Sequence, residues 1–184
     1  MKKILFLVTA ICLSIAVHTS AQESAFEQND NVVSLGIGLG GTYYRGWYSG
    51  YSGISRLPTF TFAYERCIIG NLFNEQSALG IGALGGFNYT SSSTWTSTNI
   101  LVGVRGALHY AFVDNLDTYG GVMTGYNIHS WKWKESGAST HTGSSGFTYG
   151  VFAGARYYFA GPLAVFAELG YGYTFLNAGI SLKF

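Results

Sequence analysis

Large apolar side chains alternate with small ones along most of the chain after residue 31. In "SLGIGLG", which runs from Ser34 to Gly40, one face carries only leucine and isoleucine and the other only serine and glycine. The stretches "NILVGVRGALHYAF" and "FTYGVFAGARYYF" repeat the pattern. A period of two is the signature of a β-strand, because successive side chains point to opposite faces. The sequence therefore predicts an all-β fold.

Turn-forming residues divide the chain into eight such segments, each close to the roughly 9–11 residues that a tilted strand needs to cross a bilayer. Three connections are long and polar, "RGWYSGYSGISR", "SSSTWTS" and "KWKESGASTHTGSSG", whereas "VDNLD" and "AGP" are tight turns on the other side. Two connections depart from this alternation, since "IIGNLFNEQS" is long and the one near Phe175 is short. The layout predicts an eight-stranded antiparallel up-and-down barrel with both termini at the short-turn end. The expected strands are 32–44, 57–67, 78–90, 98–112, 118–131, 147–159, 163–174 and 176–184.

The direction of the apolar face decides whether such a barrel is soluble or spans a membrane, because a soluble ligand-binding barrel alternates too, with its apolar face inside. Charged residues make up 10% of this chain, against about 25% in an ordinary soluble domain. The small-residue face would make a poor water-exposed surface but fits the narrow lumen of an eight-stranded barrel. We therefore expect a transmembrane β-barrel over residues 32–184, with a soluble barrel as the alternative.

Aromatic residues gather at the ends of the expected strands, as the two interfacial girdles of a membrane barrel require. The expected members are Tyr43, Tyr89, Trp95, Trp131, Trp133 and Tyr173 at the long-loop end, and Tyr64, Tyr110, Phe112, Tyr119, Tyr157 and Phe159 at the short-turn end.

The N-terminus has the form of an export signal. Lys2 and Lys3 precede the uncharged run "ILFLVTAICLSIAV", and small residues follow at Thr19 and Ala21. This order predicts a signal peptide over residues 1–21, cleaved before Gln22, and then a short polar periplasmic segment over residues 22–31. Without Lys2 and Lys3 the ten basic residues fall to eight, against nine acidic ones. A net charge near −1 with no basic block gives no indication of nucleic-acid binding.

The last residues, "ELGYGYTFLNAGISLKF", carry a family resemblance. With the export signal and the eight segments, the chain resembles the small outer-membrane β-barrel proteins of Gram-negative bacteria, of the OmpX/OmpA type and the opacity type. The resemblance implies localisation in the outer membrane, contact with its lipids and lipopolysaccharide, and recognition of the final strand and its terminal aromatic residue, here Phe184, by the barrel-assembly machinery. As the eighth strand it must pair with the first to close the barrel.

Charged side chains on the small-residue face are expected to point into the lumen, because ionisable groups at membrane depth face the interior and pair. If the turn "AGP" pairs Phe159 with Leu163, Gly154 lies opposite Glu168, which places Arg156 diagonally beside that carboxylate. We predict a salt bridge between them and a lumen plugged by side chains. A narrow ion path or a proton-sensitive site is the alternative. The set comprises Glu65, Arg105, His109, Arg156, Glu168 and Lys183.

Other chemical motifs are weak. Two G-x-G-x-x-G matches, beginning at Gly36 and Gly80, are not followed by the helix that a dinucleotide site needs, so we expect these glycines to relieve crowding in the lumen. His129 and Ser130 are adjacent and point to opposite faces of a strand, which argues against a base and nucleophile pair. "STHTGSSG", which contains His141, is interpreted as a flexible loop. We expect no enzyme, metal or cofactor, with a lipid A-modifying enzyme as the remaining catalytic alternative.

Aromatic residues of the expected outward loops could bind a host protein, a glycan or lipopolysaccharide, although interfacial anchoring explains them too. The favoured function is a monomeric outer-membrane barrel with a structural or surface-interaction role, and its extracellular ligand, if it has one, is unidentified. The loop residues are Trp47, Tyr48, Tyr51, Trp95, Trp131 and Trp133.

Overall fold

The structure is a computed structural model that describes residues 25–41, 55–133 and 141–184. The predicted signal peptide lies outside the described residues, as do Trp47, Tyr48 and Tyr51. No helix in the part of the chain that the structure describes is long and apolar enough to cross a membrane.

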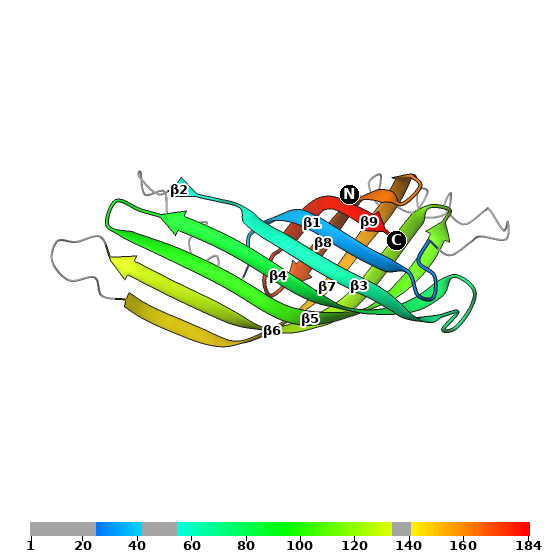
Figure 1. Cartoon of the computed structure of the whole chain (residues 1–184), viewed down its shortest axis with the longest axis horizontal. Coiled ribbons are helices and arrows are strands. Elements are labelled where there is room, and N and C mark those ends of the chain that lie inside the picture. Colours follow the sequence, from blue (N-terminus) through cyan, green and yellow to red (C-terminus); the bar gives the residue numbers. More distant parts are fainter. Residues whose placement is uncertain (1–24, 42–54, 134–140) are drawn as a thin grey trace, which may run out of the picture.

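Eight long antiparallel strands follow one another around a closed ring, and a two-residue strand extends one of them (Figure 1). This confirms the predicted fold class. The strands are β1 (Asn31–Leu39), β2 (Ser55–Arg56), β3 (Thr59–Gly70), β4 (Ser77–Ser91), β5 (Trp95–Val113), β6 (Leu116–Trp133), β7 (His141–Ala160), β8 (Leu163–Tyr171) and β9 (Leu176–Lys183).

The last strand closes the ring against the first, as the sequence predicted. β9 pairs with β1 from Val32 opposite Lys183 to Leu39 opposite Leu176. Beyond that ladder, the backbone N–H of Phe184 donates to the carbonyl of Asn31 at 2.9 Å. Where β1 and β9 close the ring, every barrel strand is paired on both sides, so this part of the sheet leaves no unpaired edge.

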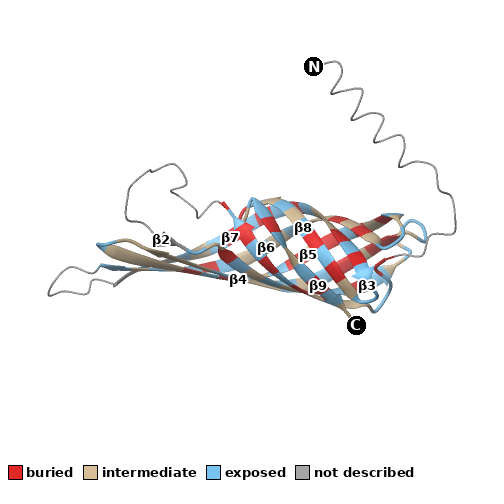
Figure 2. Cartoon of the chain, turned by 90° about the horizontal axis from the view of Figure 1, so that it is seen from above, coloured by how far each residue is buried: buried red, intermediate tan, exposed pale blue. Residues whose placement is uncertain are grey.

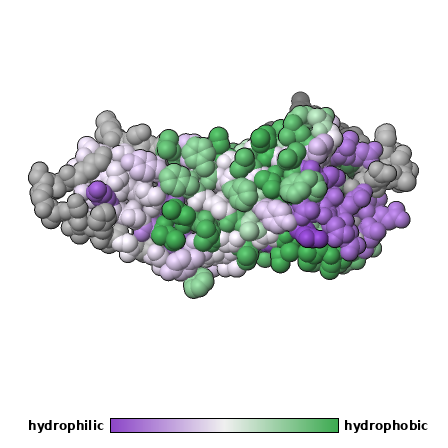
Figure 3. Space-filling view, viewed as in Figure 1, coloured by the Kyte–Doolittle hydropathy of each residue, from purple (hydrophilic) through white to green (hydrophobic). Residues whose placement is uncertain are grey.

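The barrel is inside-out relative to a soluble protein. Buried and exposed residues alternate along the barrel strands (Figure 2). Along β1, Ser34 is buried while Leu35 and Ile37 are half exposed on the outside. On the face seen in Figure 3, apolar residues gather over the middle of the molecule, and hydrophilic residues gather toward the end where the short turns lie. A closed sheet with an apolar outer belt and a polar interior is what a bilayer-spanning barrel requires.

Two of the connections at the end that holds the C-terminus are tight turns. Asp114 and Asn115 link β5 to β6, and Gly161 and Pro162 link β7 to β8. Asn115 and Gly161 adopt φ values of 62° and 55°, the left-handed conformation that two-residue hairpins favour. β8 pairs with β7 with Gly154 opposite Glu168, as predicted, but a bulge at Phe159 makes Ala160 the partner of Leu163.

The strands differ greatly in length, so one side of the barrel projects beyond the other. β4 to β7 contain 15 to 20 residues, whereas β1, β8 and β9 contain eight or nine. The outer ends of β4 to β7 form a sheet that extends past the closed ring (Figure 1). We call this part, built from residues 88–91, 95–99, 127–133 and 141–150, the projecting sheet.

Six residues of "STHTGSSG", from His141 to Gly146, do not form the expected flexible loop, and Ser139 and Thr140 lie outside the described residues. His141 to Gly146 form the outer end of β7 and pair with β6, from Lys132 to Asn127. Small polar residues carry no alternating signal, but β6 supplies the backbone partners that hold them extended. Similarly, β5 already begins at Trp95, inside the expected loop "SSSTWTS".

Candidate functional site

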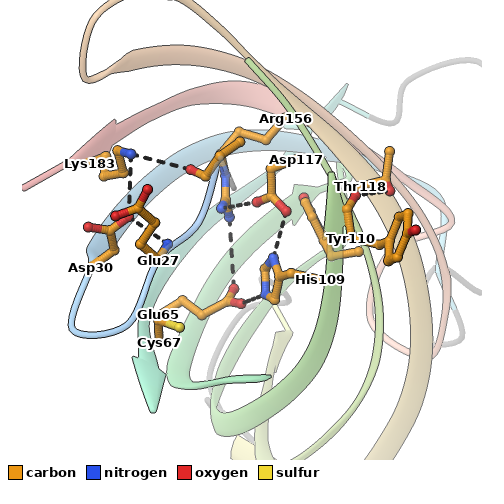
Figure 4. A network of polar contacts seen from close by, with 12 residues as sticks. Glu27, Asp30, Glu65, Cys67, His109, Tyr110, Asp117, Thr118, Arg156 and Lys183 are labelled. Carbon is orange, nitrogen blue, oxygen red and sulfur yellow. Dashed lines mark hydrogen bonds and ion pairs between the residues drawn. The ribbon is translucent and has the colours of Figure 1, made fainter. Parts of the chain in front are cut away.

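A cluster of buried charges fills the lumen near its short-turn end (Figure 4). It contains five of the six residues predicted to face the lumen, together with Asp117, which sequence reasoning missed. Five of the eight barrel strands contribute to it. We call this set the charged cluster: Glu65 of β3, Arg105 and His109 of β5, Asp117 of β6, Arg156 of β7 and Glu168 of β8.

His109 lies at the centre of the part drawn in Figure 4. Its Nδ1 lies 2.8 Å from a carboxylate oxygen of Asp117, and its Nε2 contacts the carboxylate of Glu65. A neutral imidazole has one N–H, so it cannot donate to two carboxylates. The arrangement therefore requires an additional proton, carried by the ring or shared with a carboxyl group.

The two arginines bind the carboxylates in a different pattern from the predicted one. Arg156 contacts Asp117 at 2.8 Å and Glu65 at 3.8 Å. Glu168 is instead bound by Arg105, at 3.0 Å. The predicted Arg156–Glu168 bridge is therefore wrong, because Asp117 lies directly opposite Arg156 in the β6–β7 register. Arg105 also lies 3.5 Å from Glu65, which connects the two halves of the cluster.

Aromatic side chains pack among these charges. The guanidinium carbon of Arg105 lies 4.0 Å from the centre of the Phe152 ring, and that of Arg156 lies 5.0 Å from the centre of the Tyr119 ring. The Tyr119 hydroxyl also donates to Glu168 at 3.2 Å. Tyr119 was expected in the interfacial girdle, and this is wrong, because it shares the lumen face of β6 with Asp117. Tyr173 is likewise buried and not interfacial.

The cluster is balanced in charge. Three carboxylates face two guanidinium groups, and the additional proton that His109 and its two carboxylates hold supplies the third positive charge. Lys183 lies apart from it, at the short-turn end, where its Nζ contacts Asp30 at 3.3 Å (Figure 4). Asp117 could have been found from the sequence, since it lies two residues before Tyr119 in the alternating pattern, but it was assigned to the turn "VDNLD".

Glycines make room for the charged side chains. A Cβ atom at Gly80 would lie 2.5 Å from a Glu65 carboxylate oxygen and 3.0 Å from Nε2 of His109. A Cβ at Gly36 would lie 2.7 Å from polar atoms of Thr61 and Asn177. The first glycines of both G-x-G-x-x-G matches thus relieve crowding in the lumen, as the sequence predicted.

A small cavity of about 50 Å³ lies in the lumen, with Arg105 and Glu168 of the charged cluster in its wall. Thr61 and Asn177 also line it. A buried water occupies roughly 10–15 Å³ on this measure, so the cavity has room for about four waters. This cavity is far smaller than one that holds a drug-sized ligand, and the lumen beside it is occupied by the side chains of the charged cluster.

The inner face of the projecting sheet continues the lumen side of β5 and β6. It carries Trp95, Trp131 and His129, which the sequence singled out. The rings of Trp95 and Trp131 stack with their centres 4.7 Å apart. His129 faces Asn99 at 3.2 Å and Ser97 at 3.4 Å, whereas Ser130 is exposed on the opposite face.

The backbone around Ser97 and His129 offers no oxyanion hole. These two side chains are in contact, but β5 pairs with β4 and β6 over this stretch, so its backbone amides are engaged in the sheet. Among the described residues, no group of three His, Cys, Asp or Glu side chains is placed to hold a metal ion.

The outer half of β7 has an open edge. β8 pairs with β7 only as far as Val151, opposite Tyr171. Tyr171 and Gly172 still lie against Tyr149 and Gly150, but from His141 to Thr148 no strand in the described ranges pairs with β7 on the side away from β6. The other margin of the projecting sheet is covered, because β2 pairs with β4 and Leu57 donates its backbone N–H to Tyr89 at 3.1 Å.

Comparison with solved structures finds similar barrels. Ail, the attachment invasion locus protein of Yersinia pestis, matches with a TM-score of 0.53 and 12% identity, over 84% of this chain and 99% of Ail. Its complex with the heparin analogue sucrose octasulfate matches with the same TM-score and coverage and 13% identity. The outer membrane protein OprG of Pseudomonas aeruginosa gives 0.49 and 8%, over 88% and 99% of the two chains. No protein-family model and no curated protein matches. The likeness is one of fold, that of the small eight-stranded outer-membrane barrels.

Proposed function

We propose that this chain is a monomeric, non-enzymatic outer-membrane protein that holds a partner at the cell surface through the open edge of β7. The apolar outer belt supports residence among outer-membrane lipids and lipopolysaccharide, with the short turns in the periplasm and the projecting sheet outside. The observation that carries the interaction role is the unpaired edge from His141 to Thr148, within the described part of the sheet.

An unpaired edge presents a row of backbone N–H and C=O groups that can pair with another extended chain. Proteins usually protect such edges with charged residues, proline or a bulge. The stretch "HTGSSGFTYG" contains no Lys, Arg, Asp, Glu or Pro, and its pairing with β6 has no bulge. We therefore propose an extended segment of an extracellular protein as the partner, added to the projecting sheet as a further strand.

The barrel itself serves this role as a rigid anchor. Its lumen is closed by the charged cluster, which supports a structural function for those side chains and not the passage of sizeable solutes. The stacked Trp95 and Trp131 on the inner face stiffen the outer ends of β5 and β6. Assembly is proposed to depend on the barrel-assembly machinery acting on the last strand and Phe184.

A library of random twelve-residue peptides displayed on phage tests the proposal, panned against the protein in lipid nanodiscs. We expect enrichment of peptides rich in β-branched residues. Backbone pairing supplies the affinity, and peptides that favour an extended conformation lose the least conformational entropy when they form a strand. A variant with Gly143→Lys and Ser145→Lys places two charges on the edge and should lose the selected peptides. Hydrogen exchange should show protection of the amides of residues 141–148 on binding.

Ser130→Lys is the matched control, because Ser130 lies directly opposite Gly143 on the same exposed face but on β6, whose two edges are both paired there. It should keep peptide binding. Equal loss of binding in the control and in the edge variant, or protection located outside residues 141–148, would exclude edge pairing as the mode of recognition.

A further inference from the structure

The residues before β1 fold back into the short-turn end of the barrel. Phe26 is 1% exposed and packs with Val32, Cys67 and Ala78, and its ring centre lies 4.2 Å from that of His109. Ala25 is buried against Tyr158 and Ala164 on the other side of the barrel. We call Ala25–Asp30 the N-terminal segment. Four of its six residues are polar, as expected of a linker, but its two apolar residues lie inside the lumen.

Polar contacts fasten the N-terminal segment at the rim. The backbone N–H of Asn29 donates to the carbonyl of Cys67 at 3.1 Å, and the N–H of Cys67 donates to the carbonyl of Asp30 at 2.9 Å. Lys183 donates to the carbonyl of Ala25 at 3.3 Å and pairs with Asp30 at 3.3 Å (Figure 4). Phe26 is its only large apolar side chain, and the segment forms no strand, so we expect it to open more readily than a barrel strand that is paired on both sides.

Directly behind Phe26 lies the charged cluster, and behind that lies the cavity of about 50 Å³ whose wall includes Arg105, Arg156 and Glu168. The N-terminal segment and the charged cluster thus close the lumen in series. The first closure is apolar and formed by a short peptide, whereas the second is made of side chains anchored on five strands of the barrel wall.

We propose that the N-terminal segment is a releasable stopper, and that its release admits periplasmic water and small ions to the charged cluster. Cys67 provides a native reporter, because it is fully buried against Phe26 and is the only cysteine after residue 12. With the stopper seated its thiol is covered, and with the stopper released it faces the periplasmic end of the lumen.

The test measures the rate at which N-ethylmaleimide adds to Cys67 in the folded full-length protein, by intact mass. Phe26→Ala should raise this rate about 100-fold, because truncating a packed phenylalanine shifts a local equilibrium by at least two tenfold steps. Lys183→Ala removes two rim contacts and the contact of its Nζ with the Tyr158 ring, 5.3 Å from the ring centre, but leaves the Phe26 packing in place, and it should raise the rate about tenfold. Cys67→Ser gives the background from any other thiol.

Phe112→Ala is the matched control, since Phe112 lies at the same end but is exposed on the outer face, and it should leave the labelling rate unchanged. Heat-modifiable migration in SDS gels verifies that each variant is a folded barrel. Rapid labelling of the folded wild-type protein would overturn the proposal, as would unchanged labelling in folded Phe26→Ala. If Phe26→Ala does not fold, Lys183→Ala decides, and a rate equal to that of the wild type overturns it.

Discussion

Asp117 is the carboxylate on which the charged cluster depends, and its removal gives the sharpest test of how the lumen is held together. It accepts a hydrogen bond from Arg156 at 2.8 Å and faces Nδ1 of His109 at 2.8 Å, and all three side chains are almost fully buried. Asp117→Ala leaves two cationic groups with Glu65 as their remaining nearby carboxylate. Breaking one partner out of a buried ion pair costs about 3–5 kcal/mol, and we expect a loss in this range.

The assay is urea unfolding of the protein in lipid vesicles, followed by tryptophan fluorescence. With an m-value of about 2 kcal/mol/M, the expected loss lowers the unfolding midpoint by roughly 1.5–2.5 M. Asp114→Ala, which removes an exposed aspartate from the adjoining turn, should change stability by less than about 0.5 kcal/mol. The double variant Asp117→Leu with Arg156→Met removes both charges and should recover most of the loss.

Two results would refute this reasoning. A midpoint for Asp117→Ala within 0.2 M of the wild type would mean that the cluster is not an interdependent ionic network. A double variant less stable than Asp117→Ala alone would mean that Arg156 contributes mainly through packing, or through Glu65, and not through the aspartate.

Three further predictions concern the lumen and the last strand. Gly80→Ala places a methyl group against Glu65 and His109 and should lower the free energy of unfolding by about 1–3 kcal/mol. Gly85→Ala, whose Cβ would meet nothing nearer than 3.8 Å, should be nearly neutral in the same urea titration. Equal losses of stability in the two variants would contradict the crowding of the lumen at Gly80. Phe184→Asp should reduce the fraction of heat-modifiable folded barrel in outer membranes, and Phe184→Tyr should not. Normal assembly of the aspartate variant would contradict the proposal that Phe184 is part of the assembly signal. The wild-type protein in planar bilayers should give no steady conductance of the size expected from an open pore, and such a current would contradict a lumen filled by side chains.

The alternating pattern predicted the strands and the face of each side chain well, because both depend on local geometry. Ser34 faces the lumen and Leu35 the outside, as a period of two requires. The pattern cannot say which charge meets which across the barrel, because that depends on the register and curvature of non-adjacent strands. Arg105 reaches Glu168 from a strand three places away in the ring, and no local signal records that approach.

Strand ends and the N-terminal segment escaped prediction for a different reason. The outer end of β7 is made of serine, threonine and glycine, which have no apolar face to alternate, so only its pairing with β6 defines it as a strand. Phe26 is a single large apolar residue in a polar stretch, and one residue has no period. Its burial follows from the shape of the barrel mouth, which exists only once the ring has closed.

The unequal lengths of the strands separate two tasks within this molecule. In the ring, each backbone edge is paired and the lumen is occupied by charged and aromatic side chains, so the backbone there has no hydrogen-bonding capacity left for a partner. β7 continues for ten residues past the end of its pairing with β8. Outside the hydrocarbon core, water can form hydrogen bonds with exposed N–H and C=O groups, so the sheet need not be closed there. A ring alone would have no need of such an extension. Because the projecting sheet lengthens four neighbouring strands and leaves one edge free of charge and proline, recognition is best sought there, and the charged cluster is best understood as what keeps its anchor rigid.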